Sequence, residues 1–137
     1  MSSPEYASLA DLTLYASVRP EVLAEIPSEK KTAELNAASG LAHSYVLHRY
    51  PAGLTSWGPT LRKCVVAIAC EELLRSRGYD PANVGDGTIV LLADRQRAWL
   101  RDVAQMRASI PDAVPASEAQ HRAASGATLV SSDTRGW

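Results

Sequence analysis

Residue types capable of chemistry gather in the stretch HSYVLHRYPAGL, residues 43–54, which holds two histidines, two tyrosines and an arginine within eight positions. His43 and His48 are five residues apart, so they do not share a helix face as a metal-binding i, i+4 pair would. We therefore expect no zinc site: His43 is predicted to lie on the surface and His48 to border a helix end. The cluster is predicted to be a packed helix corner, with Tyr45 turned inward and Arg49 stacked or paired locally.

The two cysteines are the next candidates, as nucleophiles. Cys64 and Cys70 lie in the most apolar stretch of the chain, and burial in apolar surroundings raises the pKa of a thiol and makes it inert. They are six residues apart within one expected helix, which places them on different faces, so the helix geometry disfavours a disulfide between them. We interpret both as free thiols of the core, as in proteins of a reducing cytoplasm.

Two further patterns resemble catalytic or phosphate-binding sites only superficially. Glu71 and Glu72 are adjacent and point about 100° apart on a helix, so we expect a solvated helix end where Arg75 pairs with them. The sequence Gly-Asp-Gly at 85–87 follows no predicted strand and precedes no lysine, and it is read as a turn rather than a nucleotide loop. The sequence predicts no catalytic residue, metal or cofactor, and the chain is not expected to be an enzyme.

Three arginines of the last expected helix could contact a partner. Arg97 and Arg101 are i, i+4 neighbours and Arg95 lies close to them. Such a face could touch DNA phosphates, although Asp94 and Asp102 interrupt it. Two interpretations remain: a solvated or subunit-contact face, and a face near DNA. No helix-turn-helix spacing with a polar recognition helix is evident.

The elements that must position these residues are helical. Apolar spacing, capping residues and prolines predict helices over residues 8–16, 21–26, 28–50, 59–77 and 88–109. Ser8 and Asp11 form a capping box, Ser28 is the expected N-cap of the third helix, and Pro111 is expected to end the last. The helix over 59–77 is apolar on all sides at its centre, so it should lie in the middle of the domain. The fold class predicted is a small all-α bundle of about four helices with an extended C-terminal arm.

Composition limits the classes of function. The 137 residues fit one domain, and a net charge of −1 argues against a protein whose main task is to grip nucleic acid. The N-terminus lacks the pattern of a signal peptide, and no apolar run reaches the roughly 20 residues that span a bilayer. We expect synthesis in a cytoplasm and no membrane partner.

The character of the chain changes after residue 110. We assign residues 1–110 to a helical domain and residues 111–137 to an arm rich in Ala, Ser and Pro. Alone, the arm cannot bury enough apolar surface to offset its ordering entropy. The arm nevertheless ends in Leu129, Val130, Arg135 and Trp137, which we predict to bind a partner.

The order of several segments resembles one protein family. These segments are YASLADL at 6–12, HRYPAGL at 48–54, GPTLRKCVVAIA at 58–69, AWLRDVA at 98–104 and, more loosely, SDTRGW at 132–137. Together they resemble the head–tail connector (head-completion or adaptor) proteins of tailed bacteriophages, in the Mu-like branch. The Ala- and Ser-rich stretch between Pro111 and Gly126 departs from the family pattern.

The resemblance implies a non-enzymatic structural protein of the virion neck. Such proteins form a ring beneath the portal, usually of twelve copies, extend the DNA channel, and offer a docking surface to the stopper or tail-completion protein. Their C-terminal arms commonly reach the portal, and packaged double-stranded DNA passes through without sequence-specific binding. The alternative from a different class is a small helical DNA-binding regulator, which the nearly neutral charge disfavours.

Overall fold

Helices dominate the architecture, as a computed structural model of the chain shows for residues 4–78 and 82–116. The described residues form five helices and two short strands. In chain order these are α1 (Leu9–Tyr15), α2 (Pro20–Ala24), α3 (Ser28–Arg49), β1 (Leu54–Ser56), α4 (Pro59–Arg77), α5 (Val84–Ala104) and β2 (Val114–Pro115). The predicted all-α class is confirmed.

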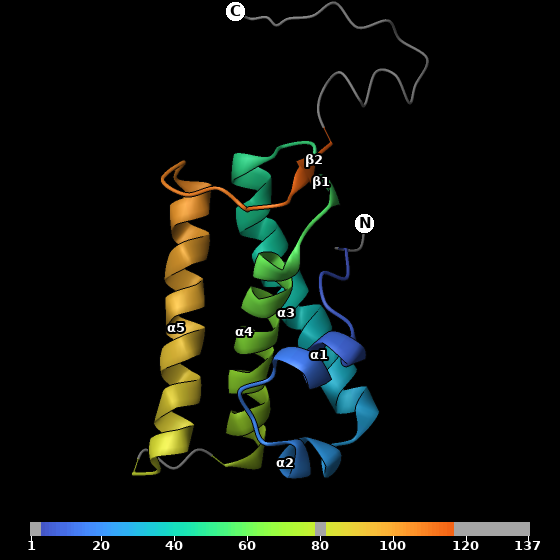
Figure 1. Cartoon of the computed structure of the whole chain (residues 1–137), viewed down its shortest axis with the longest axis vertical. Helices are drawn as coiled ribbons and strands as arrows, with labels where there is room; N and C mark the ends of the chain where they lie inside the picture. The colour runs from blue at the N-terminus through green and yellow to red at the C-terminus, as the bar shows by residue number, and fades with distance from the viewer. Residues whose placement is uncertain (1–3, 79–81, 117–137) are drawn as a thin grey trace, which may run out of the picture.

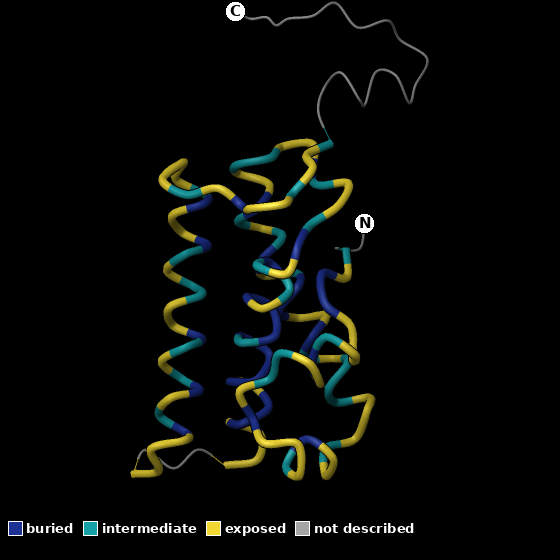
Figure 2. Tube along the Cα trace, viewed as in Figure 1, coloured by how far each residue is buried: buried dark blue, intermediate teal, exposed yellow. Residues whose placement is uncertain are grey.

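The long helix α4 occupies the centre of the bundle. Helices α3 and α5 each pack against α4 and against one another, and α1 covers α4 and α3 from the side away from α5 (Figure 1). Ten of the nineteen residues of α4 are buried, including both cysteines. Figure 2 shows the burial concentrated along α4 and on the side of α5 that faces it, whereas the outer side of α5 is exposed. The prediction that this apolar helix is central is confirmed.

The two short helices begin where the sequence predicts. The Ser8 hydroxyl accepts a hydrogen bond from the Asp11 backbone N–H at 3.2 Å, and the Asp11 carboxylate accepts one from the Ser8 N–H at 2.9 Å. This reciprocal capping box satisfies donors that the first turn leaves free. Pro20 occupies the first turn of α2, where its missing N–H costs nothing.

Helix α3 differs from the prediction at its start and matches it at its end. Ser28 is already helical and Pro27 is the cap residue without a side-chain bond, so the predicted Ser28 cap is wrong. A proline at the cap position fixes an extended backbone before the helix. The helix ends at Arg49, and Pro51 follows the cap residue Tyr50, as expected.

Helix α5 begins and ends earlier than the predicted range 88–109. Asn83 caps it by accepting from the Asp86 N–H at 3.1 Å, so residues 85–87 form its first turn and not a loop. Asp86 is buried there and pairs with Arg77 at 3.0 Å, which holds this turn against the end of α4. Met106 adopts a left-handed backbone with φ of 65° and ends the helix, so Pro111 is not the stop.

A small antiparallel sheet joins the connector after α3 to the first residues of the predicted arm. Strands β1 and β2 pair with Leu54 opposite Pro115 and Ser56 opposite Val114, and the Ala116 N–H donates to the Gly53 carbonyl at 2.9 Å. Residues 111–116 thus lie on the helical domain, on the far side of the boundary predicted at residue 110. The remaining arm, residues 117–137, lies outside the described residues.

A helix that crosses a membrane must be both long and apolar. Within residues 4–78 and 82–116, no helix is both long enough and apolar enough to cross a membrane.

Candidate functional site

The His43 end of the histidine-rich corner packs against the segment before α1. The His43 Nδ1 atom lies 2.7 Å from the hydroxyl of buried Tyr6, and the Trp57 indole N–H donates to the Tyr6 carbonyl at 3.0 Å. The rings of Tyr6 and Trp57 meet edge to face at 4.7 Å. Burial raises the pKa of Tyr6 to about 12. His43 is half-buried and not a surface residue as predicted, because the segment before α1 folds across it.

The second half of the corner ties α3 to the end of α5. An Arg49 Nη1 donates to the Met106 sulfur at 2.8 Å, and its guanidinium lies 5.7 Å from the centre of the Tyr50 ring. The Tyr50 hydroxyl accepts from the Ile110 backbone N–H at 3.3 Å. The local stacking or pairing predicted for Arg49 is confirmed by these contacts. Met106 itself is exposed because the chain turns there, although it lies within the range predicted for the last helix.

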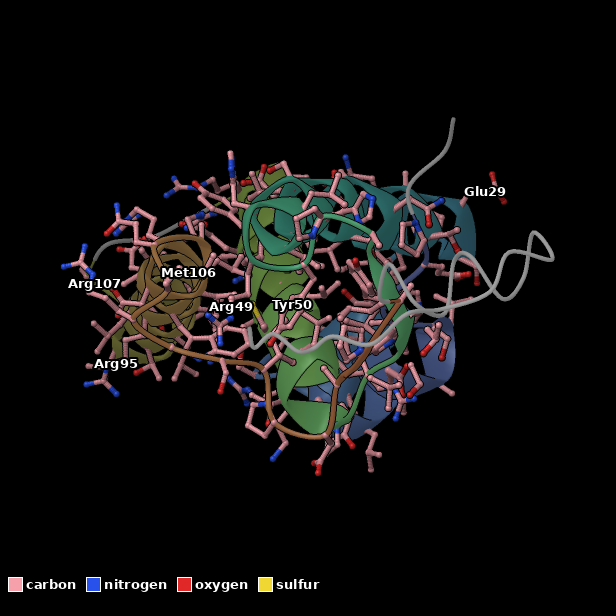
Figure 3. All side chains as sticks on the ribbon, turned by 90° about the horizontal axis from the view of Figure 1, so that it is seen from above. Glu29, Arg49, Tyr50, Arg95, Met106 and Arg107 are labelled. Atoms are coloured by element: carbon pink, nitrogen blue, oxygen red, sulfur yellow. The ribbon has the colours of Figure 1, made fainter. Side chains whose placement is uncertain are left out.

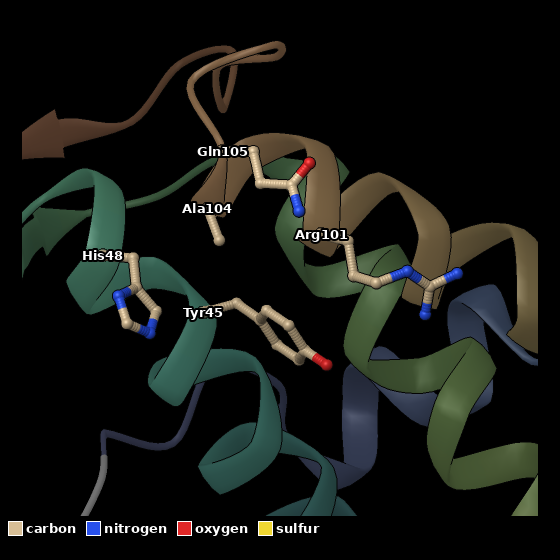
Figure 4. Close-up of a pocket in the computed structure, with 5 residues that line it drawn as sticks. All are labelled: Tyr45, His48, Arg101, Ala104 and Gln105. Carbon is tan, nitrogen blue, oxygen red and sulfur yellow. The ribbon is translucent and has the colours of Figure 1, made fainter.

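Between these helices lies an open groove of about 310 Å³ (Figure 4). Its lining comprises Tyr45 and His48 of α3 with Arg101, Ala104 and Gln105 of the α5 end. These side chains supply hydrogen-bond donors and a positive charge. None of the five is a carboxylate or a thiol, and the donors together with the Arg101 charge suit a polar or anionic group. Tyr45 is half-buried, less enclosed than its predicted inward packing.

Both thiols belong to the core. Burial raises the pKa of Cys64 to about 12, with the nearby positive charge of Arg97 acting weakly in the opposite direction. Burial also raises the pKa of Cys70, partly offset by hydrogen bonds from Ser17 and the Val18 backbone. Neither sulfur is available as a nucleophile at neutral pH, in agreement with the interpretation from sequence.

The most unexpected charged group is Glu71, which is not solvated as predicted but only 2% exposed. One carboxylate oxygen pairs with Arg75 at 2.9 Å, and the other with Arg97 of α5. Arg97 also binds Asp94 at 3.1 Å. The sequence carried a usable signal: Glu71 follows Cys64 by seven residues and Ile68 by three, so helical spacing places it on the buried face.

The structure separates the three arginines predicted to contact DNA or a subunit. Arg97 is engaged by Glu71 and Asp94, so its charge is already matched. Arg101 borders the groove beside Tyr45. Arg95 is exposed and points away from the bundle on the outer side of α5 (Figure 3). They therefore do not form one basic face.

The remaining predicted contact residues belong to the C-terminal arm. Leu129, Val130, Arg135 and Trp137 lie outside the described residues. Within the described ranges, no three His, Cys, Asp or Glu side chains gather in a way that could hold a metal ion.

The comparisons leave the family open. Comparison with protein-family models, with curated proteins and with solved structures found no match. The resemblance to head–tail connector proteins stays a prediction from the ordered sequence segments.

Proposed function

We propose that the chain is a head–tail adaptor of a tailed bacteriophage or of a phage-derived particle. It is a non-enzymatic virion protein that forms a ring beneath the portal protein. In the family that the chain resembles, the ring usually has twelve copies. The ring extends the channel for double-stranded DNA and presents a docking surface to the stopper or tail-completion protein. The protein is made in the host cytoplasm and works in the neck between head and tail.

One observation supports this proposal: the segments that resemble the connector family lie on or beside helices that pack against one another. HRYPAGL contains the corner between α3 and β1, GPTLRKCVVAIA begins α4, and AWLRDVA ends α5, and all three lie at the end of the bundle that carries the sheet (Figure 1). Trp57, just after the first of these segments, binds the carbonyl of Tyr6, the first residue of YASLADL. A set of segments scattered along the sequence is thus one connected structure.

The same end of the bundle is where the arm begins. Residue 116 is tied to the Gly53 carbonyl next to β1. The residues that follow therefore start beside the segments that carry the resemblance. An arm that binds the portal from this point leaves the exposed sides of α3 and α5 for neighbouring copies.

Co-sedimentation tests the proposal. The chain, tagged at its N-terminus, is expressed in the producing cell, and the lysate is separated on a density gradient. We expect the protein in fractions of DNA-filled particles, in amounts close to those of the portal protein. If it remains free at the top of the gradient while tailed particles form, the adaptor proposal is wrong. Salt-dependent binding of the free protein to duplex DNA would then support the regulator alternative.

The channel role has a separate test. Of the three arginines, Arg95 and Arg101 have exposed side chains, and Arg97 is held by carboxylates. Arg95→Ala and Arg101→Ala should each lower DNA retention in filled heads if that residue faces the channel. Thr88→Ala, an exposed neutral change on the same helix, is the control. Unchanged retention in both arginine variants assigns them to surface or subunit contacts.

A further inference from the structure

The groove between the ends of α3 and α5 is lined mainly by polar side chains (Figure 4). Tyr45 and His48 stand three residues apart on α3. Arg101 and Gln105 stand four residues apart on α5, and Ala104 precedes Gln105. Residues at these spacings share one face of a helix. The volume of about 310 Å³ lies at the lower end of the range for pockets that hold small molecules.

The hydrogen-bonding groups of this groove are not used by the fold. Within residues 4–78 and 82–116, no hydrogen bond, ion pair or ring contact reaches the side chains of Tyr45, His48, Arg101 or Gln105. Arg97, one turn earlier on α5, is in contrast held by Glu71 and Asp94. Phenol, imidazole, guanidinium and amide groups can all donate hydrogen bonds. The groove therefore presents donors from two helices to a group that enters it.

The end of the bundle that carries the groove has an excess of positive charge. Residues 45–65 and 98–116 contain five basic residues and two acidic ones, namely Arg49, Arg62, Lys63, Arg101 and Arg107 against Asp102 and Asp112. The other described residues contain seven basic and ten acidic ones. Asp102 lies 3.8 Å from Arg107, which offsets its charge. The surroundings of the groove therefore favour an anion.

The helix ends themselves do not supply this attraction. The last carbonyls of α3 and α5 lie at the same end of the bundle and carry partial negative charge. An anion in the groove must therefore be held by the side chains, and above all by the guanidinium of Arg101. Binding should accordingly be sensitive to single substitutions of these side chains.

The number of donors distinguishes among anions. A terminal phosphate group carries a charge of about −2 near neutral pH and three acceptor oxygens, so it can accept from both walls of the groove at once. A carboxylate has fewer acceptor oxygens and a smaller charge, and a phosphate within a nucleic-acid backbone has lost an oxygen to its second ester bond. The Tyr45 ring and Ala104 add apolar surface for an organic body.

We propose that the α3–α5 groove binds a small organic phosphomonoester. Arg101, His48 and Gln105 hold the phosphate group, and the organic part lies against the Tyr45 ring and Ala104. The site goes beyond the proposed role in the virion neck and requires only the free chain.

Titration with phenyl phosphate, followed by NMR of the isotope-labelled full chain, tests the site. We expect saturable shifts of signals from residues 45–48 and 101–105 at millimolar ligand. Inorganic phosphate lacks the ring and benzoate lacks the phosphate, so both should bind more weakly. No saturable shift in these residues would overturn the site. Benzoate as tight as phenyl phosphate would overturn the choice of phosphate, and inorganic phosphate as tight would overturn the role of Tyr45 and Ala104.

A pair of charge-matched variants tests the assigned anion contact. Arg101→Gln should weaken phenyl phosphate binding about tenfold, because it removes a charge-assisted hydrogen bond. Arg95→Gln removes the same charge from the outer side of α5, away from the groove, and should leave binding unchanged. Both side chains are exposed, so both variants should fold. Equal weakening by the two would indicate diffuse attraction to the surface, and the site would be wrong.

Filling the groove provides a test that leaves the charge unchanged. Ala104→Leu places a larger apolar side chain between the two walls and should abolish phenyl phosphate binding. Ala104 is half-buried in the last turn of α5, and leucine is a good helix former, so the dispersed NMR spectrum of the folded chain should persist. Unchanged binding would mean that phenyl phosphate binds elsewhere and would overturn the site.

A short DNA duplex separates a phosphomonoester from a nucleic-acid backbone. We expect that the duplex, at the same concentration of phosphate groups, does not displace phenyl phosphate. Displacement that disappears in Arg101→Gln would assign the groove to nucleic acid and overturn the proposal. The particle experiment is independent of this one: a chain that enters filled particles but has no phenyl phosphate site keeps the neck role and loses the groove assignment, and the converse result reverses both conclusions.

Discussion

The Glu71 carboxylate is the least exposed acidic group in the described part of the chain. Two guanidinium groups flank it in the core, one from the next turn of α4 and one from α5. Removing a charge from water costs several kcal/mol unless such partners compensate. The pair with Arg97 therefore fixes how α5 sits along α4 more than it adds net stability.

This arrangement predicts unequal effects for two neighbouring changes. Arg97→Ala leaves the buried carboxylate with Arg75 alone, so the free energy of unfolding should fall by about 2 to 3 kcal/mol. Asp94→Ala removes only an exposed partner of Arg97 and should cost less than about 0.5 kcal/mol. Urea unfolding measures both. Equal losses would show that Glu71 does not depend on Arg97.

The buried thiols predict a loss of stability in alkaline solution. Burial raises the pKa of Cys64 to about 12, and that of Cys70 also rises. Above about pH 9 the thiols of the unfolded chain lose protons that the folded chain retains, so the free energy of unfolding falls as pH rises. Urea unfolding between pH 7.5 and about 9.5 measures this slope.

The cysteines can be separated from other groups that titrate in this range. Replacing Cys64 and Cys70 by alanine should flatten the decline, even though the cavities lower stability at every pH. A slope identical to that of the unmodified chain would assign the effect to other groups, such as the buried Tyr6 hydroxyl.

At the scale of elements, the contact between the α4 entrance and residues 111–116 is tight. A side chain at Gly58 would place its Cβ 2.6 Å from the Asp112 Cβ, closer than real atoms approach. Glycine at this position lets the segment after α5 cross the start of α4 and reach β1. The small sheet is therefore part of the helical domain.

Two glycine substitutions test this contact with opposite signs. Gly58→Ala should lower the free energy of unfolding by about 1 to 3 kcal/mol, because the crossing segment must shift. Gly87→Ala, in α5 with no atom within 4 Å of its added Cβ, should raise it by up to about 1 kcal/mol. Thermal unfolding compares them. A neutral Gly58→Ala would mean that residues 111–116 are not held there.

At the scale of the whole molecule, truncation locates the end of the folded domain. A chain ending at residue 116 keeps buried Ile110 and β2, so it should retain the helical content and cooperative unfolding of the full chain. A chain ending at residue 109 loses the Ile110 contacts and the strand pair, and its unfolding midpoint should fall by several degrees. Circular dichroism during heating measures both.

The same truncation tests the arm at the level of assembly. If the arm binds the portal, the chain ending at residue 116 should fold but fail to enter particles. Normal incorporation would show that residues 117–137 are dispensable. Loss of folding in that chain, in contrast, would move the domain boundary further along the sequence.

The sequence by itself determined the helical elements. Period, caps and prolines act between residues within one or two turns, so the capping box at Ser8, the proline start of α2, the end of α3 at Arg49 and the apolar centre of α4 could be predicted. The predicted boundaries of α5 were wrong because nearby residues carry competing start and stop signals. The helix starts after the Asn83 cap and not at Thr88, and it ends before Met106 and not at Pro111.

Only the tertiary structure decided which distant residues meet. The burial of Glu71 against Arg97, the bond between Tyr6 and His43, and the pairing of β1 with β2 join segments separated by 26 to 61 residues. Such contacts depend on how whole helices pack, and a one-dimensional pattern does not encode the partner. For the same reason, the sequence predicted that Arg95, Arg97 and Arg101 lie on one face, whereas helix packing places each of them in a different environment.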